Sequence, residues 1–481
     1  MNLNLVLRTL GLVLLCESLA MVPSLLVAVY LKENSIPAFL IAIFFAGAFG
    51  FIFTKFPADP NQVSYKEGFA VATFGWLVLV IYGSLPFIFS GVLSHPVDAF
   101  FETMSGFTTT GASVLTDVEI LPRSVLLWRS FTHWLGGMGV IVLTVALIPS
   151  LKVAGLQLFR AEVPGPTKSK VLPRVAITAR ELYRIYLFIT IAEIILLKIA
   201  GMSWFDSVVH TFGTVATGGF SNKNLSVGAY ENVLIELIII FFMILCGMNF
   251  ALHYRAFRGS ELHSYWKDPE FKFYLGVITS STLLITINLL EVGDYEINRA
   301  FRAALFQVSS IVTTTGFATD DFNQWPAFSQ IILFILMFVG GCAGSTGGAI
   351  KHIRVLILIK SASRQLTRLL HPQAVIPIRL GSQTISEEVV EAVQAFFFVY
   401  ILIFAGVVIF LTSLGLDLVS ALAAVAATLG NVGPGLGLVG PASNYASLPV
   451  AAKIVLSMCM LIGRLEVYTV MVILSRRFWK P

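Results

Sequence analysis

Long apolar stretches recur along the chain with short polar segments between them. A helix needs roughly 20 apolar residues to cross the hydrocarbon of a bilayer, and the sequence contains many stretches of about that length. Two of them open the chain, and the others come in pairs on either side of a shorter segment. The predicted spans are 5–31, 36–53, 69–89, 125–147, 183–200, 232–252, 271–290, 331–359, 393–414 and 451–474. We therefore expect ten membrane-spanning helices.

Each of the four later pairs of spans encloses a segment that is too short to cross a membrane. These segments lie at 96–107, 204–215, 299–312 and 417–428. Taken singly, each is as compatible with an interfacial helix or a plain outer loop as with a re-entrant helix. Non-helical backbone is tolerated at membrane depth only where protein buries it or where it lines a wet cavity. Because all four copies lie between two spans and end in glycine, we favour re-entrant pore helices.

A threonine- and glycine-rich loop follows each short segment. The sequence FETMSGFTTTGAS at 101–113 is nearly repeated by VTTTGF at 312–317, and ATGGF at 216–220 and GNVGP at 430–434 are looser copies. Small residues also allow close helix packing, but the recurrence at one place in each unit favours a four-fold lining of one pore. The candidate pore residues are Thr109, Thr110, Gly111, Thr217, Gly218, Gly219, Thr314, Thr315, Gly316, Asn431, Val432 and Gly433.

The composition of these loops suits a dehydrated monovalent cation. Such an ion needs a cage of oxygens, which rings of backbone carbonyls supply. Glycine adopts backbone angles that other residues avoid and so lets successive carbonyls turn toward one axis. A short helix that points its C-terminal end at the axis adds the negative end of its dipole. The four loops contain no carboxylate, as expected if carbonyls select the ion.

The pattern as a whole predicts an all-α integral membrane protein. It has ten transmembrane helices and four re-entrant pore helices, arranged as four helix–pore loop–helix repeats with pseudo-four-fold symmetry behind two extra N-terminal helices. The predicted units are an N-terminal two-helix extension at 1–60 and pore-loop repeats at 61–155, 156–260, 261–365 and 366–481.

A glycine-rich stretch interrupts the span at 331–359. Five of the nine residues from Gly340 to Gly348 are glycine, and each glycine inside a helix costs about 1 kcal/mol relative to alanine. The stretch is therefore expected to be unwound, to border a cavity and to act as a gate below the filter. No G-K-[ST] ending supports a phosphate-binding loop. The candidate gate residues are Gly340, Gly341, Gly344, Ser345, Thr346, Gly347, Gly348 and Arg464.

Arg464 lies within the apolar final span, where an arginine is costly and normally faces a cavity or a partner. Two interpretations remain open: Arg464 faces the pore, or it pairs with an acid such as Glu466, Glu193 or Glu236. Two further polar residues, Arg129 and His133, lie in the segment WRSFTHW. We expect them to pack and anchor the outer end of their helix.

Composition and charge placement fix the class and the orientation. The chain is 57% apolar and only 12% charged, against about 25% charged in soluble domains, which excludes a soluble protein. Basic residues gather in alternate loops, notably 152–180 and 351–379, so these loops and both termini are expected to be cytoplasmic. Acids on the opposite face, among them Glu102, would concentrate cations there. No HExxH or GxSxG motif indicates an enzyme, and we predict no catalytic residues.

Six motifs together resemble the Trk/Ktr/HKT superfamily of cation transporters. They are FETMSGFTTTGAS at 101–113, LWRSFTHWLGGMGVIVL at 127–143, FGTVATGGFS at 212–221, LFQVSSIVTTTGF at 305–317, GGCAGSTGGAIK at 340–351 and IGRLEVYT at 462–469. The resemblance implies four pore loops in a homodimer of the bacterial cytoplasmic membrane, with Gly111, Gly219, Gly316 and Gly433 as filter glycines. It also implies that 340–348 is a gating loop which Arg464 contacts below the filter.

The same resemblance implies a transported ion and a partner. Related sodium-permeable transporters carry serine at the first filter glycine, so Gly111 favours K⁺ over Na⁺. The fourth loop, GNVGPG, departs from TTTG, and only its carbonyls are expected to contribute. Family members bind a cytosolic, nucleotide-binding ring of TrkA type, although the basic loops are also compatible with contact to anionic lipid alone. No organic cofactor and no nucleic acid partner is expected.

Potassium uptake by channel-like conduction is therefore the function we predict. One alternative is an ion-coupled alternating-access carrier, since broken helices also occur in such folds. A carrier of that kind should show inverted repeats, whereas the four pore loops share one orientation in the ten-span arrangement. A second alternative is a Na⁺/K⁺ transporter of the same superfamily.

Overall fold

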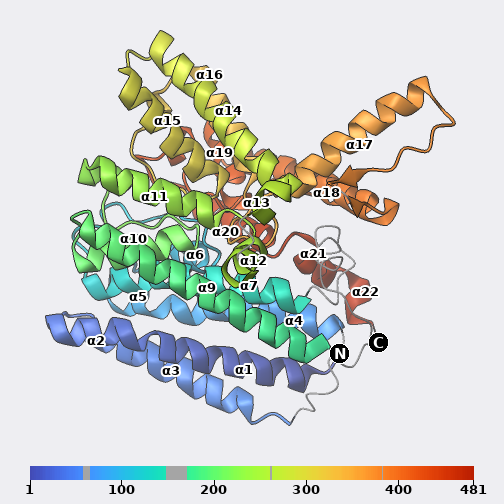
Figure 1. Ribbon diagram of the computed structural model, residues 1–481. Coiled ribbons are helices and arrows are strands. Elements are labelled where there is room, and N and C mark those ends of the chain that lie inside the picture. Colours follow the sequence, from blue (N-terminus) through green and yellow to red (C-terminus); the bar gives the residue numbers. More distant parts are fainter. Residues whose placement is uncertain (58–64, 148–170, 260–262, 382, 481) are drawn as a thin grey trace.

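The N-terminal extension consists of apolar helices packed side by side. The computed structural model describes residues 1–57, 65–147, 171–259, 263–381 and 383–480. Helices α1 (Leu3–Ala20) and α2 (Val22–Leu31) follow one another as a single span, and α3 (Ile36–Thr54) returns along α1 (Figure 1). Both predicted N-terminal spans are confirmed as apolar helices of spanning length.

Four units follow, each with a short helix between longer ones. The first contains α4 (Tyr65–Gly83), α5 (Leu85–Phe89), α6 (Pro96–Phe107) and α7 (Arg123–Leu147). The second contains α9 (Val171–Ile199), α10 (Trp204–Val215), α11 (Val233–Cys246) and α12 (Phe250–Gly259). The third begins after α13 (His263–Lys267) and contains α14 (Pro269–Val292), α15 (Ile297–Val312), α16 (Ala327–Val339) and α17 (His352–Leu370). The fourth contains α18 (Glu387–Ser413), α19 (Leu418–Leu429), α20 (Val450–Arg464) and α21 (Tyr468–Leu474), followed by α22 (Arg476–Trp479).

The short helices α6, α10, α15 and α19 are the four predicted pore helices. Two have the predicted bounds, and α15 begins two residues earlier than expected. Asp417 caps α19, since its side chain accepts a hydrogen bond from the Ser420 N–H. Short 3₁₀ turns follow three of the pore loops, at Ser226–Tyr230, Phe322–Gln324 and Gly437–Val439. One two-stranded hairpin, β1 (Arg379–Leu380) with β2 (Gln383–Thr384), is the only sheet among the described residues.

Only one of the four predicted unit boundaries falls within the described residues. Those at 60/61, 155/156 and 260/261 fall outside the described residues, as does most of the basic loop at 152–180. The boundary at 365/366 falls inside α17, which continues to Leu370. The division of the chain into these units stays a prediction.

Many apolar side chains lie on the outside of the helices. Among the described residues, five helices are long and apolar enough to cross a membrane, and two bent pairs bring the number to at most seven. Exposed side chains on these helices include Leu26, Phe44, Leu283, Phe398 and Ile409. Large apolar surfaces of this kind suit contact with lipid rather than water. The predicted total of ten spans is not tested by length and composition alone.

The pore helices form a closed ring with the helices that follow them. Each pore helix packs between the second long helix of its own unit and that of the unit before it. The sets are α6 with α7 and α20, α10 with α11 and α7, α15 with α16 and α11, and α19 with α20 and α16. The contact of α20 with α6 joins the last unit to the first (Figure 1). The fold therefore surrounds one central axis.

Two of the predicted spans are sharply bent rather than continuous helices. The span at 232–252 divides into α11 and α12, which lie at 98°, and the span at 451–474 divides into α20 and α21, at 118°. Asn249 starts α12 anew by accepting a hydrogen bond from the Ala251 N–H. At the second bend, Glu466 and Val467 both have a φ of 57°, which ends the regular helix. The span at 331–359 is interrupted as predicted, between Val339 and His352.

The close approach of α1 and α3 gives a prediction for stability. A methyl group on Gly11 would lie 2.7 Å from the Gly50 carbonyl oxygen and 2.8 Å from Phe53 Cβ. Gly11→Ala should therefore force the two helices apart at a cost of about 1–3 kcal/mol. Gly68→Ala is the matched control, since a methyl group there meets nothing within 4 Å. Thermal unfolding in detergent should be lowered by the first change only, and equal unfolding temperatures would contradict this packing.

Candidate functional site: a ring of four pore loops

All four pore helices end in the same hydrogen-bonded turn. The residue after the helix cap has a left-handed conformation, and the next N–H bonds back to a carbonyl five residues earlier, as in a Schellman motif. The left-handed residues are Thr109 (φ 51°), Thr217 (54°), Thr314 (59°) and Asn431 (53°). The returning bonds run from Thr110 to Ser105 (2.9 Å), Gly218 to Gly213, Thr315 to Ser310 and Val432 to Ala427 (each 2.8 Å).

Backbone handedness then alternates in each loop. The residue after each left-handed one is not left-handed, and the third residue is a glycine with positive φ. These glycines are Gly111 (84°), Gly219 (78°), Gly316 (82°) and Gly433 (100°). Glycine is needed there because other residues rarely adopt such angles. Threonine is β-branched and strained at positive φ, so three of the four loops hold strain of the kind found at functional sites.

The four loops interlock around the axis. A methyl group placed on any of the four glycines would collide with a carbonyl oxygen of the next unit. The facing pairs are Gly111 with Gly218, Gly219 with Thr315, Gly316 with Val432 and Gly433 with Thr110. The fourth pair returns to the first unit, so the loops form a closed ring. The structure thus brings all twelve predicted pore residues together.

A cavity opens on one side of this ring, the side predicted to face outward. Its volume is about 160 Å³, and all four glycines line it together with Arg129, Lys223 and Tyr445. Among the described residues, no Asp or Glu lines this cavity. The expectation that Glu102 lies on an acidic rim is wrong, because Glu102 is buried and its Oε1 lies 2.7 Å from Arg129 Nε.

Arg129 and His133 are packing residues in the first half of α7, consistent with the expectation that they pack this helix. Both are buried behind the first two pore loops. Arg129 Nη1 donates to the Ser221 carbonyl at 2.9 Å, and His133 Nδ1 lies 2.7 Å from the Gly106 carbonyl oxygen. The helix α7 therefore supports the ring from behind.

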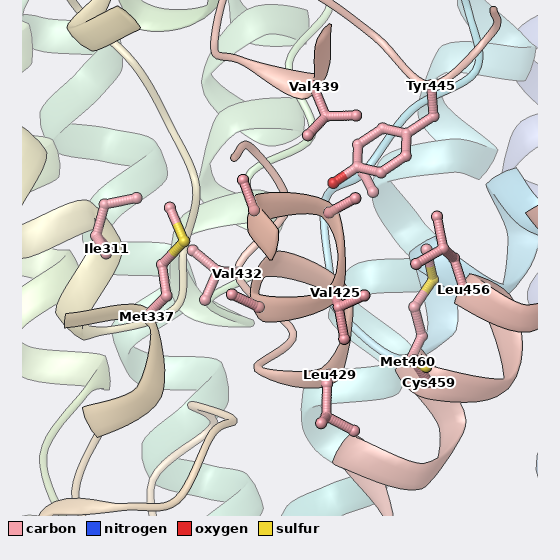
Figure 2. Packing of buried hydrophobic residues seen from close by; sticks show 14 of the residues in the cluster. Ile311, Met337, Val425, Leu429, Val432, Val439, Tyr445, Leu456, Cys459 and Met460 are labelled. Carbon is pink, nitrogen blue, oxygen red and sulfur yellow. The ribbon is translucent and has the colours of Figure 1, made fainter. Parts of the chain in front are cut away.

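Other side chains hold the remaining loops. Hydroxyl pairs brace the first and third loops, where Thr108 and Thr110 are 2.8 Å apart and Thr313 and Thr315 are 2.7 Å apart. In the fourth loop, Asn431 Nδ2 donates to the Thr110 hydroxyl (3.0 Å) and the Met460 carbonyl (2.9 Å). Val432 packs in the apolar core, and Figure 2 shows it close to Met337 and Ile311.

The glycine-rich stretch forms an irregular loop between α16 and α17. Two of its glycines, Gly340 and Gly344, have φ values of 73° and 78°. The bend between α11 and α12 holds this loop, because the Gly247 carbonyl accepts from the Cys342 N–H at 2.8 Å and the Phe250 N–H donates to Gly344 at 3.0 Å. The predicted interruption is therefore docked against a second broken helix.

The same loop contacts the ends of three pore helices. The Thr346 hydroxyl donates to the Val215 carbonyl at the end of α10 (3.2 Å), and the Gly348 N–H donates to the Thr314 hydroxyl after α15 (2.8 Å). A methyl group on Gly348 would lie 2.6 Å from the Gly430 carbonyl oxygen after α19. Gly341, Ser345 and Gly347 lie in the same turn of chain, where the Gly347 N–H donates to the Ser345 hydroxyl (3.2 Å).

Arg464 contacts the glycine-rich loop rather than a carboxylate. Its Nη1 donates to the Thr346 carbonyl at 2.7 Å. Of the three acids considered as partners, Glu466 pairs with Lys351 (3.0 Å) and Arg354 (2.5 Å), and Glu236 pairs with Arg302 (2.7 Å). Among the described residues, no ion pair joins Arg464 to Glu193 or to any other acid. The interpretation of a carboxylate partner is therefore wrong.

Glu270 is a supporting residue that the sequence reasoning missed. Its buried Oε1 accepts from the Ala343 N–H (2.7 Å) and the Ile353 N–H (3.1 Å). It thus joins the first half of the glycine-rich loop to the start of α17. The available signal was an acid in the first turn of an apolar helix, directly after the Asp268 cap.

Four short helices that end on one closed ring, among apolar helices long enough to span a membrane, define an all-helical membrane protein. The chain belongs to the TrkH family of cation transport proteins, whose family model matches residues 32–480. It is a multi-pass membrane transport protein and not an enzyme.

Named relatives cover essentially the whole chain. The Trk system potassium uptake protein TrkH of Halomonas elongata is 40% identical and that of Salmonella typhimurium 42%, each over 100% of both chains. The TrkG protein of Escherichia coli is 36% identical over 96% of both. The crystal structure of the potassium transporter TrkH from Vibrio parahaemolyticus matches with a TM-score of 0.92 and 39% identity over 100% of both chains.

The buried ion pair behind the first two loops generates a stability prediction. Glu102→Gln keeps the side-chain shape but leaves buried Arg129 without a counter-charge, which should cost about 3 kcal/mol. The control is Glu181→Gln, since the Glu181–Arg184 pair is exposed and is worth less than about 1 kcal/mol. Thermal unfolding in detergent measures both. A loss for Glu102→Gln no larger than that for the control would contradict the role of this pair.

Proposed function

We propose that this chain is the potassium-translocating subunit of a bacterial Trk-type uptake system and conducts K⁺ in a channel-like manner. The observation that carries the proposal is the closed ring, in which each glycine faces a carbonyl oxygen of the next unit. Four such oxygens, from Thr110, Gly218, Thr315 and Val432, provide neutral ligands of the kind that replace the hydration shell of K⁺. The potassium uptake named in the relatives supports the same ion.

The selectivity filter in this proposal consists of the three-residue segments 109–111, 217–219, 314–316 and 431–433. Alternating backbone handedness turns successive carbonyls to one side of a chain, and four equal segments make stacked rings. The C-terminal ends of α6, α10, α15 and α19 add negative dipole ends beside the ion. No fixed negative charge lines the outer cavity among the described residues, so the ion is held loosely enough to leave.

The gate in this proposal is the glycine-rich loop at 340–348 together with Arg464. The loop lies against three pore helices and is held by Glu270, the bend at Gly247 and the Arg464 guanidinium. Movement of α20 or α17 would pull on the loop directly, since Glu466 ties the bend after α20 to Lys351. A cytosolic nucleotide-binding ring of TrkA type on the basic face would drive that movement. The working assembly is a homodimer in the cytoplasmic membrane with both termini cytoplasmic.

Two alternative functions can be distinguished from the proposed one by experiment. An alternating-access carrier is disfavoured because inverted repeats would face opposite sides, whereas all four filter glycines line one cavity. Saturable uptake of an organic solute driven by Na⁺ or H⁺ would favour it. A Na⁺/K⁺ transporter of the same superfamily is disfavoured by Gly111, and equal permeation of both ions would favour it.

Growth of a potassium-auxotrophic host at low K⁺ tests the function directly. The wild-type chain, expressed with its ring partner, should restore growth and Rb⁺ uptake because the filter accepts both ions. The control is the same host with the ring partner alone. Failure to restore uptake despite normal membrane expression would refute the proposed function.

Selectivity gives a sharper test. In Gly111→Ser the new side chain collides with the Gly218 carbonyl oxygen, which displaces one ligand from the ring. Na⁺ permeation relative to K⁺ should therefore rise, by about tenfold if one ligand of the site is lost. The measurement is the reversal potential of purified protein between K⁺ and Na⁺ solutions. An unchanged reversal potential would remove Gly111 from the filter.

The proposed gate gives a prediction about basal flux rather than selectivity. Deletion of Gly344, Ser345 and Thr346 removes the hydrogen bonds that join the loop to Phe250, Val215 and Arg464. Basal K⁺ flux into proteoliposomes should rise, because the loop no longer reaches the pore helices. Size-exclusion chromatography confirms that the variant is folded. Equal or lower flux in folded protein would argue against a gate.

A further inference from the structure

The second pore loop is built differently from the others at the middle position of the ring. Thr110, Thr315 and Val432 carry side chains that hydroxyl pairs or apolar packing hold in place. Gly218 has no side chain, and its φ is not left-handed. The backbone therefore does not require glycine at this position, so another constraint must account for it.

That constraint is the imidazole ring of His133. A methyl group on Gly218 would lie 2.6 Å from both Cγ and Cδ2 of His133, so the ring occupies the space that a side chain would take. His133 Nδ1 must carry the hydrogen in its 2.7 Å contact with the Gly106 carbonyl, because a carbonyl only accepts. The imidazole also stacks on Phe220, with centroids 4.0 Å apart and planes at 22°.

Arg129 extends the contact by one helical turn. Residues four apart lie on one face of a helix, and the Arg129 guanidinium carbon lies 3.5 Å from the centroid of the Phe220 ring. Arg129 also donates to the Ser221 carbonyl and is itself fixed by Glu102. The helix α7 of the first unit therefore contacts the second loop at Gly218, Phe220 and Ser221.

We propose that His133 is a positioning residue for K⁺ selectivity, because it sets the place of the Gly218 carbonyl in the oxygen ring. The inference rests on the proposed function of the ring. Outer partners that orient ion ligands typically change affinity by about 10–100-fold when they are lost. Without the imidazole, the second loop has a void behind it and no side chain of its own to fill that void. The carbonyl can then move, and the ring admits Na⁺ more readily.

Reversal potentials of the purified full-length protein between K⁺ and Na⁺ solutions test this role. His133→Ala should lower the K⁺/Na⁺ permeability ratio by about tenfold. His133→Gln should recover most of the ratio, since its amide N–H can donate to Gly106. His253→Ala is the matched control, because His253 is equally buried and makes two hydrogen bonds, to Tyr265 and Leu245, outside the ring. It should lose stability and keep its selectivity.

A double-mutant cycle tests the contact separately. Gly218→Ala should unfold at lower temperature and lose selectivity, and His133→Ala should relieve both losses because it makes room for the methyl group. Unchanged selectivity in His133→Ala would overturn the proposal, and so would equal loss in the His253 control or additive effects in the cycle. A wild-type protein without K⁺ preference would instead refute the proposed function, and with it the selectivity role of His133. In that case the double-mutant cycle measured by unfolding temperature still tests whether His133 and Gly218 are in contact.

Discussion

The contact of each positive-φ loop glycine with the carbonyl oxygen of the next unit is the constraint on which the rest of the structure depends. Four backbones can approach this closely only where no side chain intervenes. Glycine has no side chain, and it also adopts the positive φ that each loop has at this position. The contact is cyclic, so it fixes the number of units at four and brings the last unit against the first. The shared terminal turn of the four short helices, and the left-handed residue two positions before each glycine (threonine in three loops, Asn431 in the fourth), accompany that geometry.

The ring is symmetric in its backbone and asymmetric in its support. Hydroxyl pairs brace two loops, an imidazole from the neighbouring unit braces the second, and apolar packing braces the fourth. The glycine-rich loop adds a further asymmetry, because only the third unit supplies it and it meets the ends of α10, α15 and α19. Selection thus belongs to all four units in this account, whereas opening belongs to the third and fourth.

The sequence predicted those features of the fold that depend on neighbouring residues in the chain, namely helix ends and helix interruptions. The pore helices at Pro96–Phe107 and Trp204–Val215 have the expected bounds, since caps and terminal turns mark them, and glycine content predicted the interruption after Val339. The bends after Cys246 and Arg464 were missed because each pair of helices is together long and apolar enough to read as one span. The packing role of Arg129 and His133 was expected but their partners were not, because those partners lie on other helices and loops far along the chain.

Anomalous scattering from crystals grown in Rb⁺ tests the central claim most directly. Rb⁺ density is expected on the axis of the ring, within coordination distance of the carbonyl oxygens of Thr110, Gly218, Thr315 and Val432. Absence of density there, in a protein that transports Rb⁺ and with density at another site, would contradict the claim that these four carbonyls form the ion pathway.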